Sequence, residues 1–328
     1  MIWLSEADVA RLVTVDDALE AVEAAFRLKA EGQAHGRPRQ RVGGRAWLHV
    51  MPAAIPAWGV MGFKAYTTGR QGARFMVFLF DSESGEPLAA IEADELGRWR
   101  TGAASGVACR YMARPDSRVA ALIGCGYQAR TQALAIASVL ELETIRVFCR
   151  TPGRAEAFCR ELQPALGATR LEPAGSAAEA ARGADVVVTI TNARDPVLPA
   201  DAVGPGTCIV AAGSNHVARR ELEPATVLAA DRVVVDDLDQ ARLECGDLVG
   251  AEGAGFTWDR VVELADVVAG RVPGRAGPEE ITLFESQGVA LEDVALARRL
   301  LERAVAAGVG VRLPATIGLW EGRGPQHP

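Results

Sequence analysis

A glycine-rich turn at 124–129, which reads GCGYQA, is the clearest chemical pattern in this chain. The turn follows the apolar run Val119–Ile123 and precedes a helical pattern over 128–140. Strand, glycine turn and helix in this order are the context in which a G-x-G-x-x-A pattern binds a dinucleotide. Gly124 allows the tight turn, and Gly126 lets the backbone approach a pyrophosphate at the helix N-terminus. The sequence therefore predicts a dinucleotide site, and the alternative is a strand-to-helix turn without a ligand.

The end of the next strand indicates which dinucleotide is bound. Ile145–Phe148 reads as that strand, and the loop after it carries Arg150, Thr151 and Arg154 but no acid. An NAD site usually has an acid here to hold the ribose 2′-hydroxyl, whereas an arginine accommodates a 2′-phosphate. Guanidinium and hydroxyl groups suit a phosphate dianion. The pattern favours NADP(H), with NAD(H) as the alternative if the arginines only face solvent.

Length, composition and charge indicate the class of protein. A chain of 328 residues, 49% of them hydrophobic, is long enough for about two domains with sizeable cores. The net charge of −7 and the lack of a basic run argue against a nucleic-acid partner. The N-terminus MIWLSEADVARL has acids where a signal peptide is basic, and no stretch approaches about 18 apolar residues. Together with six cysteines that show no metal-ligand spacing, these features predict a cytoplasmic enzyme without a membrane span or a metal site.

From residue 115 to 289 the chain alternates strand and helix signals. Apolar, β-branched runs separated by helical patterns are found at 119–123, 145–148, 169–171, 185–190, 207–212, 232–235 and 281–284. Such runs between helices predict an α/β fold with a Rossmann-type, doubly wound parallel sheet. Ligands of such folds bind beyond the carboxyl ends of the strands. The relevant loops are those after Ile123, Phe148, Ile190 and Ala212.

Residues 1–114 read differently and predict a separate α+β domain. Helical patterns over 5–13 and 15–29 precede an arginine-rich link at 37–41. Strand patterns at 46–51, 60–66, 75–81 and 88–92 indicate a mixed or antiparallel sheet. The final helical pattern, 291–307, is expected to pack back on this domain, with Ser286-Gln287-Gly288 as the joint. We therefore divide the chain into one domain of residues 1–114 with 290–328, and a second of residues 115–289.

Seven motifs follow one another in an order that is more specific than the glycine turn alone. They are GFKAY (62–66), FLFDSESGEPLA (78–89), RTGAASGVA (100–108), LIGCGYQA (122–129), GSNHVARREL (213–222), VVVDDLDQA (233–241) and TLFESQGVALEDVALA (282–297). Their order and spread over nearly the whole chain resemble the ornithine cyclodeaminase/μ-crystallin family. The resemblance implies homodimers that combine an N-terminal substrate-binding and dimerisation domain with a Rossmann domain. Members of the family reduce imino acids, oxidise amino acids, cyclodeaminate ornithine or lysine, or bind a ligand together with NADPH.

The resemblance also implies roles for three cationic residues. Lys64 matches the catalytic lysine of the family's G-x-K motif, and an ammonium group on an apolar strand is costly unless an anion pairs with it. Arg100 matches an arginine that binds the substrate carboxylate, and it is expected to start a helix, where an anion is well placed. Arg41 corresponds to a further carboxylate-binding arginine, although neighbouring arginines leave that register open. For each residue a solvated position is the alternative.

Two positions depart from the cyclodeaminase pattern. Asn215 stands where the cyclodeaminases have an acid/base aspartate, and an amide cannot shuttle a proton at neutral pH. It can still hydrogen-bond a substrate nitrogen or the nicotinamide carboxamide. His49 stands at the position that resembles a cyclodeaminase glutamate; it is either a proton donor with a pKa near neutrality or a structural histidine, and His216 is a second candidate of the same kind. Both departures argue against ornithine cyclodeamination and favour simpler hydride chemistry.

The predicted reaction is reduction of a small imino acid, or oxidation of the amino acid, at its α-carbon by NADP(H). A cyclic ketimine such as pyrroline- or piperideine-2-carboxylate is the expected substrate, bound by Arg41, Met51, Lys64 and Arg100. The candidate catalytic residues are Lys64, Asn215 and His49. An open-chain amino-acid dehydrogenase, an ornithine or lysine cyclodeaminase and a non-catalytic NADPH-dependent binding protein of the crystallin type are the alternatives. The expected cofactor contacts are Arg100, Thr101, Gly124, Gly126, Tyr127, Gln128, Ala129, Arg150, Thr151, Arg154, Thr189, Thr191, Gly213, Ser214, Asn215 and Gly288.

Overall fold

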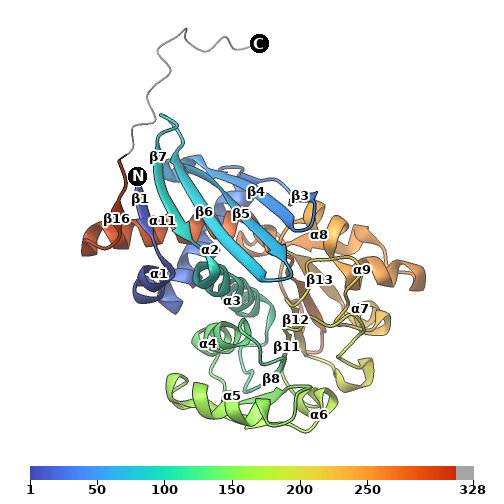
Figure 1. Cartoon of the computed structure of the whole chain (residues 1–328). Helices are drawn as coiled ribbons and strands as arrows, with labels where there is room; N and C mark the ends of the chain where they lie inside the picture. The colour runs from blue at the N-terminus through green and yellow to red at the C-terminus, as the bar shows by residue number, and fades with distance from the viewer. Residues whose placement is uncertain (315–328) are drawn as a thin grey trace.

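Two eight-stranded sheets form the framework of the protein, whose structure is a computed structural model that describes residues 1–314. The end of the expected return segment, residues 315–328, lies outside the described part of the chain. Figure 1 shows the first sheet, in blue and cyan, above the second, which comes from the later part of the chain. Helices lie between the two sheets and around the second one.

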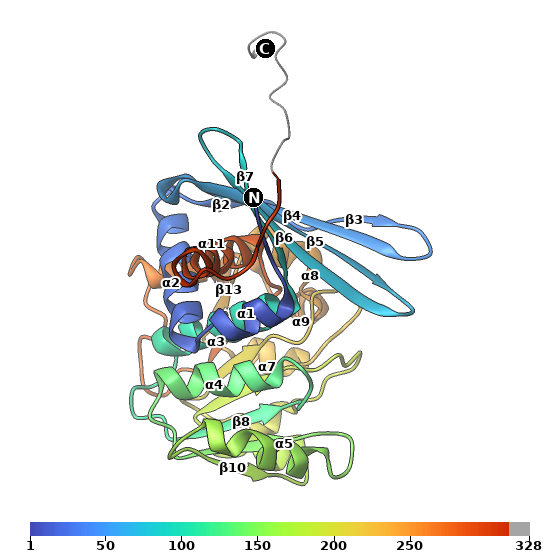
Figure 2. The same cartoon turned by 60° about the vertical axis from the view of Figure 1, so that its left-hand side comes forward.

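The first sheet is mixed, as the N-terminal strand patterns indicate. Its strands are β1 (Ile2–Leu4), β2 (His35–Gly36), β3 (Gln40–Gly43), β4 (Trp47–Ile55), β5 (Val60–Gly69), β6 (Gly72–Asp81), β7 (Pro87–Glu92) and β16 (Val311–Arg312). Their order is β16-β1-β7-β6-β5-β4-β2, with β3 also paired to β4, and only β1 and β7 run parallel. The hairpins β3–β4 and β5–β6 project well beyond the rest of the molecule (Figure 2).

The second sheet is entirely parallel and confirms the Rossmann-type, doubly wound fold. Its strands are β8 (Val119–Ile123), β9 (Thr144–Phe148), β10 (Arg170–Pro173), β11 (Val186–Thr189), β12 (Cys208–Ala211), β13 (Arg232–Val235), β14 (Val261–Glu263) and β15 (Thr282–Glu285). Their order is β10-β9-β8-β11-β12-β15-β13-β14. The strand order reverses between β8 and β11, which places a ligand crevice at that edge. The short β14 has no counterpart among the predicted strands.

Some of the helices that cover these sheets begin where the sequence offers a local cap. Ser5, Thr14 and Ser176 each accept a hydrogen bond from the backbone N–H three residues further on, at the starts of α1, α2 and α6. The helices are α1 (Glu6–Leu12), α2 (Val15–Ala30), α3 (Asp94–Met112), α4 (Ala129–Val139), α5 (Arg154–Leu162), α6 (Ala177–Ala181), α7 (Pro224–Ala229), α8 (Leu238–Glu244), α9 (Gly246–Ala251), α10 (Leu264–Val268) and α11 (Ala290–Ala307).

Helix α3 corrects the expectation that Arg100 starts a helix. The helix begins at Asp94, so Arg100 lies nearly two turns inside it. Its N-terminus has no side-chain cap of its own; the carboxylate of Glu6 in α1 accepts hydrogen bonds from the backbone of Asp94 at 2.7 Å and of Glu95 at 2.8 Å. Because the capping group comes from far along the chain, the local sequence offers no capping side chain at the helix start, although Asp94 and Glu95 make the first turn acidic.

Helix α11 returns from the second sheet to the first, as the pattern at 291–307 predicted. It packs on β4, β5 and β6 and on helices α2 and α3, following the joint at 286–288. Its buried face includes Leu291, Val294, Leu296 and Leu300, and also Glu292 and Asp293. Two acids within an apolar helix face require partners, and those partners lie in the site described next.

Candidate active site

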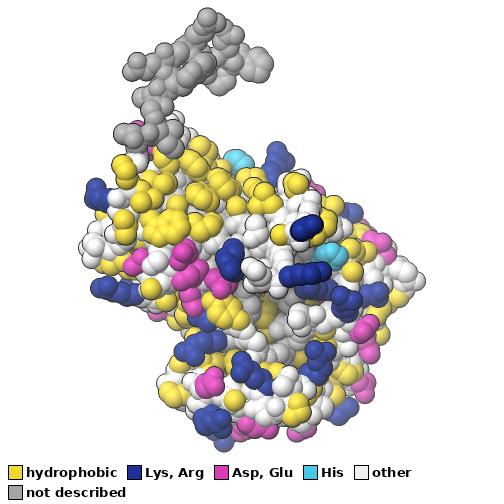
Figure 3. All heavy atoms as spheres, in the orientation of Figure 1, with side chains coloured by type: hydrophobic (Ala, Val, Ile, Leu, Met, Phe, Trp, Pro, Cys, Tyr) yellow, Lys and Arg dark blue, Asp and Glu magenta, His cyan; other side chains and the backbone are white. Residues whose placement is uncertain are grey.

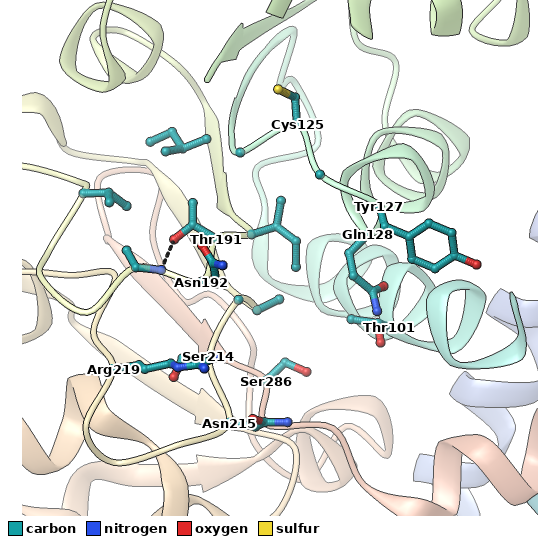
Figure 4. Close-up of a pocket in the computed structure, with 18 of the residues that line it drawn as sticks. Thr101, Cys125, Tyr127, Gln128, Thr191, Asn192, Ser214, Asn215, Arg219 and Ser286 are labelled. Atoms are coloured by element: carbon teal, nitrogen blue, oxygen red, sulfur yellow. Dashed lines mark hydrogen bonds between the residues drawn. The ribbon is translucent and has the colours of Figure 1, made fainter. Parts of the chain in front are cut away.

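A cleft runs along the carboxyl ends of the parallel strands. It encloses about 560 Å³ and is lined by the loops after β8, β9, β11, β12 and β15 (Figure 4). Four of these loops are the ones indicated by the sequence pattern, and the fifth contains Ser286, Gln287 and Gly288. Helix α3 contributes Arg100 and Thr101. This is the place where an open α/β sheet with this strand order binds a dinucleotide.

The glycine turn has the geometry that the motif requires. Gly124 has a φ of +111°, and a Cβ there would lie 2.4 Å from the carbonyl oxygen of Ile190, so no side chain fits. A Cβ on Gly126 would meet nothing within 4 Å, because this part of the turn faces open space before α4. The N–H groups and the dipole at the start of a helix attract a pyrophosphate to such a position.

Most of the residues expected to contact the cofactor line this cleft. They are Arg100, Thr101, Gly124, Gly126, Tyr127, Gln128, Arg150, Thr151, Thr191, Gly213, Ser214, Asn215 and Gly288.

Three expected cofactor contacts do not line the cleft. Ala129 is fully buried at the start of α4, where its small side chain lets the helix pack closely. Arg154 is exposed in the first turn of α5 and lies outside the lining. Thr189 is buried at the end of β11, and its hydroxyl donates to Glu221 at 3.0 Å rather than to the cleft. Ala129 and Thr189 therefore point into the protein, and Arg154 points to solvent away from the cleft.

A second cavity of about 350 Å³ adjoins the dinucleotide cleft. Arg100, Gln128, Asn215 and Arg219 line both spaces. Figure 3 shows basic side chains gathered around the hollow between the upper and lower halves of the molecule. The other residues that line the cavity come from residues 39–75 of the first sheet, from the start of α3 and from the loop after β12: Arg39, Arg41, His49, Lys64, Tyr66, Thr68, Phe75, Ala93, Asp94, Gly97 and His216.

Lys64 lies on the inner face of β5 and is 3% exposed. Its Nζ donates to Asp293 Oδ1 of α11 at 2.9 Å and lies 5.3 Å from the centre of the Phe75 ring. Burial and the nearby Arg100 and Arg39 lower the pKa of Lys64 from 10.5 to about 8, against the effect of Asp293. Lys64 is therefore mostly protonated at neutral pH but gives up its proton far more readily than an ordinary lysine.

Arg100 reaches the same acid from helix α3. Its Nε donates to Asp293 at 3.2 Å and its Nη1 to Glu292 at 2.9 Å. Burial raises the pKa of Glu292 from 4.5 to about 8, although Arg100 lowers it. Glu292 is thus largely neutral at neutral pH, and Arg100 retains positive charge for an anionic ligand.

The structure resolves which arginines of the 37–45 segment enter the site. Arg41 lines the second cavity, donates to the backbone oxygen of Asn215 at 3.0 Å and forms an ion pair with Glu244. Arg39 lines it too; it is buried, pairs with the same Glu244 and donates to the backbone oxygens of Gln287 and Gly288 at 3.1 and 3.2 Å. The sequence does not distinguish Arg39 from its neighbours, because a row of arginines contains no signal for which one is buried.

Met51 is not among the residues that line the second cavity, in contrast to the expectation that it contacts the substrate. It is 1% exposed, and its sulfur lies 3.2 Å from Nε of Arg39. The alternation of side chains along β4 places Met51 on the inner face like His49, but deeper in the core. Met51 thus contacts the guanidinium group of Arg39 from the side of the core.

Four residues opposite one another on adjacent strands form one wall of the second cavity. Arg41 on β3 pairs in register with His49 on β4, His49 with Tyr66 on β5, and Tyr66 with Phe75 on β6. The rings of His49 and Tyr66 stack with their centres 4.2 Å apart, and those of Tyr66 and Phe75 are 5.0 Å apart. This wall is flat, partly aromatic and charged at one end.

His49 does not have the near-neutral pKa expected of a proton donor. Burial, together with the charges of Arg41 and Arg39, lowers the pKa of His49 from 6.5 to about 4. Its Nε2 lies 3.0 Å from the hydroxyl of Thr68. A neutral imidazole stacked in the wall is the structural alternative that the sequence left open.

Asn215 and His216 lie in the exposed loop after β12. Both line the second cavity, and Asn215 also lines the dinucleotide cleft. Nδ1 of His216 accepts a hydrogen bond from the backbone N–H of Ala218 at 3.1 Å. The position of Asn215 between the two spaces suits an amide that hydrogen-bonds ligands on either side.

Sequence reasoning missed the acids that hold the cations in place. Asp293 and Glu292 are fully buried, and Glu244 is 1% exposed. The available signal was the pair of acids at 292–293 inside the apolar helical pattern, since acids are rarely buried without cationic partners. Within residues 1–314, no group of three or more His, Cys, Asp or Glu side chains could hold a metal ion. No helix of that part of the chain is long and apolar enough to cross a membrane.

The fold and the two adjoining spaces define a Rossmann-type dinucleotide-binding protein with a cationic pocket beside its cleft. A sequence model of the ornithine cyclodeaminase/mu-crystallin family matches residues 1–308. The chain belongs to that family, as the motifs indicated.

Relatives and solved structures of this family are similar over most of the chain. A Delta(1)-pyrroline-2-carboxylate reductase of Bacillus cereus is 36% identical over 80% of this chain and 83% of its own length. The structure of the Thermococcus litoralis Delta(1)-pyrroline-2-carboxylate reductase in complex with NADH and L-proline matches with a TM-score of 0.91 and 33% identity, over 95% of this chain and 100% of that one. An archaeal alanine dehydrogenase dimer with bound NAD matches with a TM-score of 0.89 and 33% identity, over 95% and 98% of the two chains.

The lowered pKa of Lys64 can be measured directly, because the chain has only two lysines, Lys29 and Lys64. In an NMR titration of isotope-labelled lysine, we expect Lys64 to titrate near pH 8 and Lys29, whose pKa is raised by Asp237 and Glu263 against desolvation, above 10.5. Asp293→Asn is expected to lower the pKa of Lys64 further, because it removes the carboxylate that favours the charged form. A Lys64 signal that titrates at 10.5 or higher would contradict the described burial.

Proposed function

We propose that this chain catalyses the NAD(P)H-dependent reduction of the C=N bond of a small imino acid and the reverse oxidation of the CH–NH bond. The observation that carries the proposal is that the cationic second cavity opens onto the dinucleotide cleft, with Arg100, Gln128, Asn215 and Arg219 shared between them. The likeness to pyrroline-2-carboxylate reductases supports a cyclic ketimine, pyrroline- or piperideine-2-carboxylate, as the substrate. We place the reaction in the cytoplasm, where the six free cysteines stay reduced.

In this proposal the second cavity binds the substrate carboxylate. Arg100, Arg41 and Lys64 present cationic groups to the cavity, and each is held by a neighbouring acid, so little ordering is required when the ligand enters. The nicotinamide supplies the hydride when it is bound. Holding the imino carbon beside the cleft turns an encounter of two ligands into a reaction within one complex, which can be worth about 7–11 kcal/mol in well-oriented systems.

Lys64 is the proposed source of the proton that the reduction consumes. An imine that gains a hydride at carbon must also gain a proton at nitrogen, and the Lys64 ammonium can donate one because its pKa is about 8. The donation leaves a neutral amine on Lys64, which regains a proton from solvent, while Asp293 keeps Nζ in place at 2.9 Å. His49 remains neutral throughout, since its pKa is about 4, and serves as part of the wall.

The likeness to the archaeal alanine dehydrogenase favours a second candidate function, oxidative deamination of an open-chain amino acid. The same cations would bind its carboxylate. The two functions differ in one requirement: reduction by the dehydrogenase consumes ammonia together with a 2-oxo acid, whereas reduction of a cyclic ketimine does not.

For the cofactor we propose NADP(H). Arg150 and Thr151 line the cleft after β9, at the position that contacts the adenosine ribose in this fold, and no acid accompanies them. Both residues are exposed and free to contact a 2′-phosphate. The bound NADH and NAD of the two structural neighbours make NAD(H) the alternative.

We further propose a homodimer that forms through residues 1–114 together with the segment from 290 onward, the substrate-binding and dimerisation domain. The outer face of the first sheet carries partly exposed apolar side chains, among them Met61, Phe63, Phe78 and Phe80, and Figure 3 shows apolar atoms concentrated over this sheet. Val42 and Trp47, near the tip of the β3–β4 hairpin, are also apolar and are 68% and 50% exposed. A patch of this kind marks an interaction site, and the dimeric state of the alanine dehydrogenase neighbour supports a second copy as its partner.

The substrate class is tested by following NADPH or NADH oxidation with cyclic ketimines, and with pyruvate and ammonia. We expect turnover with the ketimine alone. Arg100→Gln is expected to raise KM by about tenfold or more, because a hydrogen bond to a charged group contributes about 1.5–3 kcal/mol. Arg110→Gln, in the exposed last turn of the same helix, is the matched control. Activity only with pyruvate and ammonia would favour the second candidate, and cofactor binding without any turnover would reject both.

The cofactor proposal is tested by comparing kcat/KM for NADPH and NADH. Arg150→Ala is expected to reduce the value for NADPH by about tenfold or more and to leave that for NADH nearly unchanged, because only NADPH carries the 2′-phosphate. Arg154→Ala serves as the control, since that side chain does not line the cleft. Preference of the unaltered protein for NADH would show the NADP(H) proposal to be wrong.

The dimer is tested by sedimentation. Phe78→Asp places a charge in the centre of the apolar sheet face and is expected to yield monomers, because burial of an unpaired carboxylate costs several kcal/mol, on the order of the penalties known for isolated charges. Leu243→Asp, at an apolar position that is 61% exposed on α8, is the control and is expected to remain dimeric. A Phe78→Asp protein that still sediments as a dimer would exclude this face as the interface.

A further inference from the structure

A single buried carboxylate lies between two of the loops that line the dinucleotide cleft. Glu221 is 1% exposed and follows the loop that begins after β12. The two loops in question are Ile190–Ala193, after β11, and Ala212–Asn215, after β12, and both contribute residues to the lining. Ile190 and Ala212 still donate their N–H groups to Ile123 and Thr189 of neighbouring strands, both at 2.9 Å. The residues after them lie beyond the ladder of the sheet, so other contacts have to fix their shape.

All four oxygen contacts of Glu221 go to these loops and the strand before them. Oε1 accepts hydrogen bonds from the backbone N–H and the hydroxyl of Thr191, both at 2.6 Å. Oε2 accepts from the backbone N–H of Gly213 at 2.8 Å and from the hydroxyl of Thr189 at 3.0 Å. One side chain thus joins the end of β11, the loop after it and the loop after β12.

The two loops are packed closely around Glu221. A Cβ on Gly213 would lie 2.3 Å from the backbone N and O of Thr191 and 2.5 Å from Glu221 Oε1. The backbone of Glu221 is itself held, because Asp247 accepts hydrogen bonds from the N–H groups of Glu221 and Leu222, both at 2.8 Å. The glycine therefore lets the two loops approach closely enough to share one carboxylate.

These loops belong to the end of the cleft that is remote from the adenosine ribose. In a Rossmann fold the glycine turn binds the pyrophosphate and the loop after the second strand contacts the adenosine ribose, which leaves the nicotinamide half to the other end. Figure 4 shows Cys125 of the glycine turn at one end and Ser214, Asn215 and Ser286 toward the other. Asn215 also lines the second cavity, where the proposed substrate binds.

We propose that Glu221 is a positioning residue for the nicotinamide half of the cofactor, which shapes the two loops without contacting the ligand. The inference rests on the proposed dinucleotide-dependent function and adds a residue to it. Burial raises the pKa of Glu221 from 4.5 to about 7, against the hydrogen bonds of Thr191 and Gly213, which lower it. The geometry favours the carboxylate, because the four neighbours can all donate and two of them are backbone N–H groups that cannot accept. In Glu221→Gln the side-chain NH2 group would face one of these two N–H groups in either orientation of the amide. Two donors would then face each other, and one hydrogen bond would be lost.

The test compares binding of two probes, the reduced dinucleotide and ADP-ribose, which lacks the nicotinamide. For Glu221→Gln we expect the Kd of NADPH or NADH, whichever the unaltered protein binds more tightly, to rise about tenfold, equivalent to about 1.4 kcal/mol. The Kd of ADP-ribose is expected to stay the same, because its binding loops are not held by Glu221. Binding by titration calorimetry does not depend on turnover, so the result is separate from the identity of the substrate.

Two further variants complete the experiment. Glu223→Gln removes a carboxylate two residues away that accepts from the backbone of Ala200 instead, and it is expected to bind both probes normally. Gly213→Ala is expected to repeat the selective loss of dinucleotide affinity, because its Cβ pushes the loops apart. Equal weakening of both probes in Glu221→Gln would mean a general structural role, and unchanged dinucleotide binding would mean that the loops do not need this carboxylate; either result would overturn the proposal.

Discussion

Asp293 joins two cations that reach it from different parts of the fold. Lys64 of β5 and Arg100 of α3 both donate to its Oδ1, at 2.9 and 3.2 Å, and Asp293 itself lies in the first turn of α11. Charged groups with so little exposure are tolerated only when they are paired, so the strand and the two helices have to meet at this point. The position of Lys64 and Arg100 beside the second cavity and the return of α11 to the first sheet both depend on these two ion pairs with Asp293.

The sequence predicts those parts of the site whose signal is local. The glycine turn at 124–129 gave the position of β8 and α4 because strand, turn and helix are consecutive in the chain. The start of α3 was missed because its capping acid, Glu6, is 88 residues away from Asp94. The sequence left the role of His49 open for the same reason: the burial and the arginine charges that lower its pKa arise only when the strands have paired. Buried acids such as Glu244 lie on helices that approach the site only in the folded protein.

The two halves of the site are held by different kinds of contact. The loops of the dinucleotide cleft are fixed by hydrogen bonds from backbone N–H groups to buried carboxylates: Glu221 serves two of them, and Asp236 accepts from the N–H of Gly288 at 2.6 Å. The second cavity is held instead by cation–carboxylate pairs such as Lys64–Asp293 and Arg39–Glu244. The backbone hydrogen bonds give the dinucleotide cleft one fixed shape, which suits a ligand that does not vary. The cations of the ion pairs in the second cavity can also bind the carboxylate of an incoming ligand.

The wall formed by Arg41, His49, Tyr66 and Phe75 consists of one residue from each of four neighbouring strands. Because strand side chains alternate between faces, a replacement in this row alters the pocket without disturbing the opposite, apolar face of the sheet. None of the four belongs to the loops that form the glycine turn or the contacts of Glu221, and of the four Arg41 hydrogen-bonds to one of these loops, at the backbone oxygen of Asn215. Substitutions along this row of four residues can therefore change the ligand of the second cavity while the dinucleotide cleft is kept. This gives a short evolutionary route between enzymes of one family that act on different substrates.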